Sequence, residues 1–197
     1  TNDGTQMLDG IHDQIELRGT NTTISGIGTV TGTNNRRCIR VSNGNKTILA
    51  GTNLTLIGDV YINSNLLITN NGAISMYDLE AQNTVTGWTN AVNSTLTVEN
   101  LLFNGGNGVL TASATGNTVL YASTGNENIK QPSANNYFNL TVGGGNTKTL
   151  IGDIGILGDL LIASTLNSST FDIGTKYPLF PFWTISIGPL SQLNETT

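Results

Sequence analysis

Hydrophobic and polar residues alternate along most of this 197-residue chain. Alternation with a period of two is typical of a strand with one buried face, because successive side chains of a strand point to opposite sides. Clusters of Gly and Asn separate the alternating segments and indicate turns. We therefore predict strands in residues 23–30, 38–42, 53–62, 95–103, 117–123, 138–143 and 154–163. Residues 76–82, MYDLEAQ, are the one segment that could form a helical turn.

Residues 45–64 and 146–164 repeat one pattern, in which a Lys-Thr pair precedes apolar residues around a Gly-Asp pair. The two stretches align on Gly58 and Gly158, with Lys46 and Lys148 upstream. Sandwiches and barrels also contain many short strands, but internal similarity favours a solenoid. The sequence therefore predicts an all-β fold, a parallel β-helix or β-solenoid with short strands and Gly, Asn or Asp corners. At about 20 residues per coil, the chain would make nine or ten coils.

The Gly-Asp pairs are interpreted as corners. Gly152, Gly155 and Gly158 would let the backbone bend, and Asp153 and Asp159 would accept backbone N–H bonds there. Asn and Thr on the outside of such a fold could form hydrogen-bonded ladders.

The polar residues are mostly uncharged, with 26 Asn and 30 Thr against a charged fraction of 11%. The net charge of −5 and the lack of a basic patch predict no nucleic-acid partner. No apolar run is long enough for a membrane span. The single Cys38 leaves no internal disulfide and is either buried or paired between chains. The start at Thr1 is interpreted as a processed chain or a fragment.

Residues 136–174 contain the pattern Tyr-x-Asn-Leu-Thr, a Gly-rich turn, Thr-Lys-Thr-Leu, and then alternating Gly and aliphatic residues up to Ser-Thr-Leu. The matching positions are Tyr137, Asn139, Leu140, Thr141, Thr147, Lys148, Thr149, Leu150, Gly152, Ile154, Ile156, Gly158, Leu160, Ile162 and 164–166. This stretch resembles a repeat module of large secreted, adhesin-like β-solenoid surface proteins of Bacteroidota. The resemblance implies a structural or adhesive role outside the cell, and it defines no catalytic residues.

Residues that could carry chemistry are scattered. His12, the only histidine, lies near Asp9, Asp13 and Glu16 but is interpreted as a polar strand or cap residue. A polysaccharide-active enzyme would need two carboxylates at a set separation, and the pair Asp153 and Asp159 is already explained as corners. One His and one Cys do not suit a zinc site. The glycines of residues 104–112 lack the Asp of calcium-binding repeats. We therefore predict no enzyme activity, no cofactor and no metal.

The segment NNRRCIRVS, residues 34–42, is the one basic cluster. Alternation would place Arg36, Cys38 and Arg40 on one face and Arg37, Ile39 and Val41 on the other. We interpret it as a solvated edge.

Seven Asn-x-Ser/Thr sequons are possible glycosylation sites. They are Asn21, Asn45, Asn53, Asn93, Asn139, Asn167 and Asn194. Chance alone predicts a similar number, so they are permissive only.

The last residues do not continue the repeat. We therefore divide the chain into a single solenoid domain, residues 1–175, and a C-terminal cap or assembly segment, residues 176–197. The segment concentrates the candidate assembly residues Tyr177, Phe180, Phe182 and Trp183.

These features predict an extracellular or cell-surface structural protein that associates with itself into a filament or surface layer. The alternatives are an adhesin-type module that binds surface glycans, a polysaccharide-active enzyme, and an ice-binding protein. The last is suggested by Thr-x-Thr steps at residues 29–31, 95–97 and 147–149.

Overall fold

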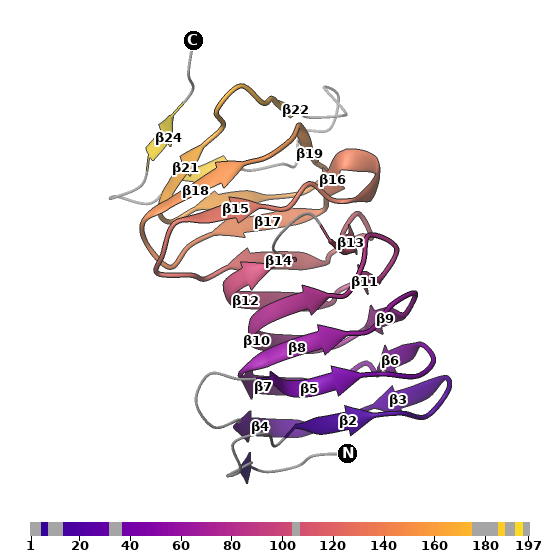
Figure 1. Cartoon of the computed structure of the whole chain (residues 1–197). Helices are drawn as coiled ribbons and strands as arrows, with labels where there is room; N and C mark the ends of the chain where they lie inside the picture. Colours follow the sequence, from indigo (N-terminus) through magenta and orange to yellow (C-terminus); the bar gives the residue numbers. More distant parts are fainter. Residues whose placement is uncertain are drawn as a thin grey trace.

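The computed structural model describes residues 5–7, 14–31, 37–103, 107–174, 185–187 and 192–194. Every strand pairing among these residues is parallel, and they contain no α-helix. The turns stack into a β-solenoid with the N-terminal turns at one end (Figure 1). The predicted fold class is confirmed.

The strands form four sheets. The path of the long sheet follows β1 (Thr5–Met7), β4 (Ile27–Thr31), β7 (Asn53–Ile57), β10 (Ala73–Ala81), β12 (Thr95–Leu102), β14 (Thr118–Tyr121), β17 (Asn139–Val142), β20 (Leu160–Ile162) and β23 (Ile185–Ile187). Beside this path lie β2 (Ile15–Leu17), β5 (Arg37–Val41) and β8 (Asp59–Ile62), where β5 pairs with both others and β8 also pairs with the second half of β10.

The five-stranded sheet has the order β13 (Val109–Thr111), β11 (Gly87–Asn90), β9 (Leu67–Asn70), β6 (Lys46–Ile48) and β3 (Thr22–Ile24). The four-stranded sheet contains β15 (Glu127–Ile129), β18 (Thr147–Leu150), β21 (Thr165–Asn167) and β24 (Gln192–Asn194). The three-stranded sheet contains β16 (Asn136–Tyr137), β19 (Ile154–Ile156) and β22 (Ile173–Gly174), and a short 3-10 turn, η3 (Ser133–Asn135), precedes it.

A column of inward aliphatic side chains runs through the long sheet and forms the centre of the core. Its members pair in register and are all buried: Leu54, Ile74, Leu96, Val119, Leu140 and Leu160. Successive members are 20, 22, 23, 21 and 20 residues apart. The corners thus take more residues than expected, and the described solenoid makes about seven turns instead of nine or ten.

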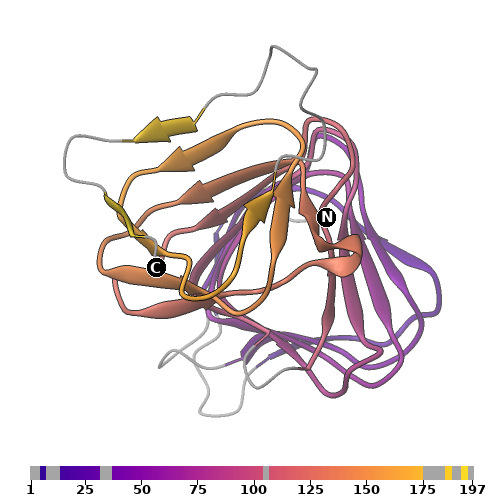
Figure 2. The same ribbon diagram turned by 90° about the horizontal axis from the view of Figure 1, so that it is seen from above.

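The stack contains a seam between an earlier and a later half. The five-stranded sheet ends at β13, and the four-stranded sheet begins at β15. A single bridge between Ala112 and Tyr137 joins β13 toward β16, whereas the long sheet continues through β12, β14 and β17. Seen along the stack, the later turns lie to one side of the earlier ones (Figure 2). Buried Phe103, at φ 54°, lies at this seam.

Three local expectations are corrected. Residues 76–82 are mostly strand, because β10 extends to Ala81. Gly155 lies inside β19, where an added Cβ would meet Asn136 Oδ1 at 2.2 Å. It is therefore required by a close approach to its neighbour and not by a corner. The repeat aligned on Gly58 and Gly158 occupies unlike places, because β8 pairs with β5 and the second half of β10 whereas β20 pairs with β17 and β23.

The inward column predicts a large cost for Leu96→Ala. Leu96 is fully buried in the middle of the stack, so we expect the free energy of unfolding to fall by about 2–5 kcal/mol. Denaturant unfolding measures the change. Thr97→Ala, on the outward side of the same strand, is the matched control and should change stability by less than about 0.5 kcal/mol. Equal effects of the two substitutions would contradict the inward assignment.

Candidate functional site

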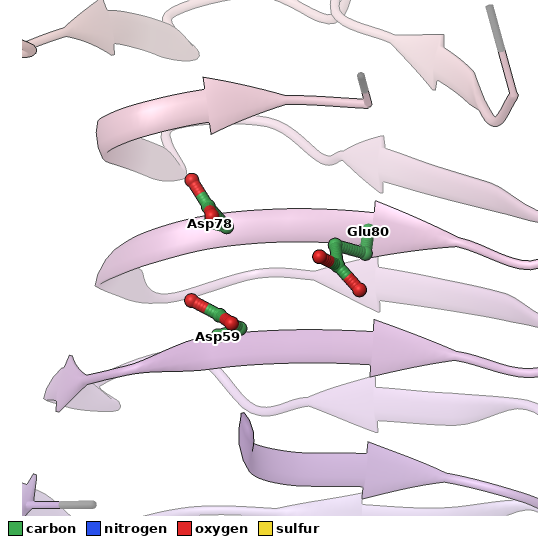
Figure 3. Close-up of side chains that lie close together, drawn as sticks. All are labelled: Asp59, Asp78 and Glu80. Atoms are coloured by element: carbon green, nitrogen blue, oxygen red, sulfur yellow. The ribbon is translucent and has the colours of Figure 1, made fainter. Parts of the chain in front are cut away.

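Three carboxylates gather where β8 and β10 lie side by side (Figure 3). One oxygen each from Asp59, Asp78 and Glu80 lies within 4.8 Å of the others. The backbone turns sharply at Gly58, φ 145°, just before Asp59. The pairing of β10 with β12 is irregular between Met76 and Asp78, and here the alternation of exposure along β10 breaks. These two corner distortions bring the carboxylates of adjacent turns together.

The cluster offers oxygen ligands of the kind that hard cations prefer, although Ca²⁺ takes six to eight of them. Asp78 is almost buried, and its Oδ1 accepts hydrogen bonds from Asn100 Nδ2 at 2.8 Å and from the backbone N–H of Leu101 at 2.7 Å. These bonds tie the corner of β10 to β12, which gives Asp78 a structural role. The sequence contained a signal for this cluster, because Asp59 and Asp78 are 19 residues apart, close to one turn.

A charged and aromatic row crosses the same side of the solenoid. Glu16, Arg40, Tyr61 and Glu80 occupy matching positions in β2, β5, β8 and β10. Hydrogen bonds from the Arg18 guanidinium to Glu16 Oε2, 2.5 and 2.8 Å long, lower the pKa of Glu16. Arg40 Nε donates to Asn63 Oδ1 at 3.2 Å. Opposite charges thus lie within this row.

The expected alternation of the basic cluster is wrong. The register of β5 shifts between Arg37 and Ile39, so Cys38 and Ile39 are both buried. Arg40 is partly exposed and faces away from Cys38. Burial raises the pKa of the Cys38 thiol to about 12, with a smaller contribution from the Asp59 carboxylate. Cys38 is a core residue, and Arg36 lies outside the described residues.

The two lysines of the repeated pattern point inward and bind turn carbonyls. Lys46 Nζ donates to the carbonyl oxygens of Gly19, Asn43 and Gly44. Lys148 Nζ donates to those of Ser123, Gly125 and Gly145, at 2.8, 2.8 and 2.6 Å. Both side chains are buried, and burial lowers the pKa of each ammonium. In each case one ammonium joins the Gly-containing corners of two successive turns.

A buried acid lies next to Lys148. Glu127 pairs with Lys148 across β15 and β18, is 5% exposed, and both its carboxylate oxygens are shut off from solvent. Burial raises its pKa to about 8; the Lys148 ammonium and the Leu102 amide offset part of this rise, and Asp78 adds to it.

Two buried tyrosines lie near the same acid. The hydroxyls of Tyr121 and Tyr137 are 3.0 Å apart, and the N–H of Lys130 donates to the Tyr121 hydroxyl at 2.9 Å. The Tyr137 hydroxyl donates to the Lys130 carbonyl. Burial raises the pKa of both phenols, so both stay neutral. The seam therefore has a polar interior.

Asp153 has the corner role that the sequence predicted, because its Oδ1 accepts the N–H of Asp172 at 3.0 Å. At Asp159 the backbone takes part in the corner: its N–H donates to Asn139 Oδ1 at 2.8 Å, and its carbonyl accepts the N–H of Leu140. Two pockets lie toward the C-terminal end of the described solenoid. One, about 430 Å³, is lined by 168–174, and the other, about 280 Å³, by 134–136, 153–155, Asp172 and Gly174.

Several predicted residues lie outside the described part of the chain. They are His12 and the four aromatic residues Tyr177, Phe180, Phe182 and Trp183. Strands β23 and β24 extend the long and the four-stranded sheets into residues 176–197.

The sequons differ in access. Asn21, Asn45, Asn53 and Asn93 are exposed, although Asn45 Oδ1 accepts the N–H of Leu67. Asn139 and Asn167 are half-buried, and each side-chain oxygen accepts a backbone N–H, from Asp159 and Ser169. The side chain of Asn194 is outside the described residues.

The Thr-x-Thr steps do not form one array. Thr29 and Thr97 share a column of the long sheet with Thr55 and Ser75, whereas Thr149 lies in the four-stranded sheet. A different row forms instead on the five-stranded sheet, where Thr23, Thr47, Thr69, Thr89 and Thr111 pair in register. Its signal in the sequence is a single Thr recurring every 20–24 residues, which a search for Thr-x-Thr does not detect.

Comparison with known proteins gave no matching family, no matching characterised protein and no matching solved structure. Among the described residues, no helix has the length and apolarity that crossing a membrane requires.

Removal of the Lys148 ammonium should destabilise the fold. Lys148→Met leaves three turn carbonyls without their donor, and we expect the free energy of unfolding to fall by about 2–4 kcal/mol. Lys130→Met is the matched control, because Lys130 Nζ makes one long bond, 3.3 Å, to the Asn107 carbonyl. Chemical denaturation compares the two. A Lys148→Met protein as stable as Lys130→Met would show that the corner does not need the ammonium.

Glu127 should make stability depend on pH. Between about 4.5, the pKa of an exposed glutamate, and about 8, the folded chain keeps a proton that the unfolded chain has released. The free energy of unfolding therefore falls as pH rises through this window. Glu127→Gln should remove this part of the slope and be more stable than the native chain at pH 8.

The pH series is measured by denaturant unfolding, with exposed Glu99→Gln as the control. The charged and titratable neighbours that act on Glu127 or feel its charge are Lys148, Asp78, Tyr121 and Tyr137. An unchanged slope in Glu127→Gln would assign the pH dependence to other groups.

Proposed function

We propose that this chain is a non-enzymatic structural protein of the cell exterior or cell surface that associates with itself end to end. The observation that carries this proposal is the edge of β3, the last strand of the five-stranded sheet. A parallel solenoid propagates by adding one strand per turn, so an open edge is a template for the first turn of another copy. An end-to-end contact of unlike surfaces continues into a filament unless rotation closes it.

The orientation of the β3 backbone supports strand addition. The carbonyl of Ile24 accepts the N–H of Leu49, so Ile24 faces β6. Because alternate residues of a strand direct their backbone groups to opposite edges, Thr23 directs its N–H and C=O away from β6. No strand among the described residues pairs there. A charged fraction of 11% provides little repulsion against pairing of edges.

Two further arguments concern location and the C-terminal segment. An exterior rich in uncharged amides and hydroxyls, and the resemblance of residues 136–174 to secreted surface repeats, support a position outside the cell. Tyr177, Phe180, Phe182 and Trp183 are proposed as additional assembly contacts. Burial of each large aromatic side chain would contribute about 1.5–3 kcal/mol.

A second candidate function is binding of surface glycans. The row of Glu16, Arg40, Tyr61 and Glu80 favours it, because an aromatic ring between charged hydrogen-bonding groups is a common arrangement in small-ligand sites. The row lies on the side of the stack, so glycan binding and end-to-end association are compatible.

Electron microscopy of the native chain and of two Thr23 variants tests the assembly proposal. Thr23→Pro removes the outward N–H and should abolish filaments while leaving the β spectrum in circular dichroism. Thr23→Ala keeps the N–H and should still assemble, which separates the backbone from the side chain. A native chain that stays monomeric at high concentration in light scattering, or equal behaviour of the two variants, would overturn the proposal.

A further inference from the structure

The five-stranded sheet carries an outward row of threonines at matching positions in all five strands. Thr23, Thr47, Thr69, Thr89 and Thr111 pair in register from β3 to β13. Thr111 Oγ1 lies 2.9 Å from Ser133 Oγ. The structure records no hydrogen-bond partner within the described chain for the other four hydroxyls. We call the outer side of these five strands the threonine face.

The row is held rigidly from within the core. Inward Trp88 is 1% exposed, and its Nε1 donates to Asn90 Oδ1 at 2.8 Å. Asn70 Nδ2 donates to the same oxygen at 3.1 Å and to the Thr95 carbonyl at 3.0 Å. β-branched threonine in a strand also has few rotamers. The hydroxyls and methyls therefore repeat at the strand separation, about 4.7–4.9 Å, with little conformational entropy to lose on binding.

The threonine face is uncharged. The only charged residue of its five strands is Lys46, which points inward to turn carbonyls. Next to the threonine row lies a second row of Leu67, Gly87 and Val109, and Leu67 and Val109 are 38% exposed. Charges lie elsewhere, in the row from Glu16 to Glu80. A face of this kind fits an uncharged partner, because a charged one would lose its hydration without gaining a counter-charge.

We propose that the threonine face binds the surface of ice. The partner must be uncharged and must present hydrogen-bonding groups at a short, regular repeat. Crystalline water meets both requirements, since the oxygen repeat along the a axis of hexagonal ice is close to the strand separation. The methyl groups and the row of Leu67 and Val109 provide the apolar part of the contact, and the free hydroxyls take positions in the water lattice.

A crystalline neutral polysaccharide fits this face less well. Sugar rings bind best against exposed aromatic rings, and the one aromatic residue of these five strands, Trp88, is buried in the core. The threonine face lies on the side of the stack, so binding there does not depend on the free edge of β3.

Thermal hysteresis and adsorption of the fluorescently labelled chain to a growing ice crystal test the proposal. The native chain should adsorb to ice and separate the melting and freezing temperatures. Thr69→Lys and, independently, Thr89→Lys should lose both effects, because each places an ammonium in the middle of the row. Thr149→Lys is the matched control, since Thr149 has a comparable outward position in the middle strand β18 of the four-stranded sheet and should keep both effects.

All three variants are first checked for an unchanged circular dichroism spectrum and melting temperature, and two variants on the face guard against one failing to fold. Absence of ice adsorption by the native chain would overturn the proposal, as would equal loss in Thr69→Lys and Thr149→Lys. Binding to microcrystalline cellulose or chitin without adsorption to ice would assign the face to a polysaccharide instead. Loss of filaments in Thr23→Pro with retained ice adsorption would separate the two functions.

Discussion

Each turn of this chain depends on parallel hydrogen bonding to the turns before and after it, and the register of that pairing decides which side chains enter the core. Leu54, Ile74 and Leu96 stay in one column although the turns between them differ in length. A shift by one residue would exchange inner and outer side chains along a whole strand. The differences in length are therefore taken up at the corners, and the corners are where the unusual residues are found.

The corners create a second problem, because closely packed turns direct backbone carbonyls into the interior. An unpaired buried carbonyl costs about 1–3 kcal/mol, and three of them converge at the corners beside Lys46 and Lys148. An ammonium has three donors and satisfies three carbonyls at once. This explains why a lysine, the residue least suited to a core by its charge, occurs twice in the same short pattern next to a Gly-containing turn.

The sequence predicted the fold class because alternation, turn residues and self-similarity all report local geometry. It did not predict the Asp59 and Asp78 cluster or the threonine row, because both depend on which residues become neighbours one turn later. The number of residues per turn varies too much for that to be read from a fixed period. It also misjudged Cys38 and Asp78, since an irregular pairing at one residue breaks the alternation on which the prediction relied.

The sides of the solenoid differ in charge for a reason that the register makes visible. Glu16, Arg40 and Glu80 share one side because their strands pair in sequence, and there opposite charges can compensate one another. The side that carries Thr69 and Thr89 has none of this compensation and needs none. Because few charges are available in the whole chain, their segregation leaves one broad uncharged surface. A partner that recognises that surface must do so by shape and spacing, which a rigid parallel ladder provides without additional ordering cost.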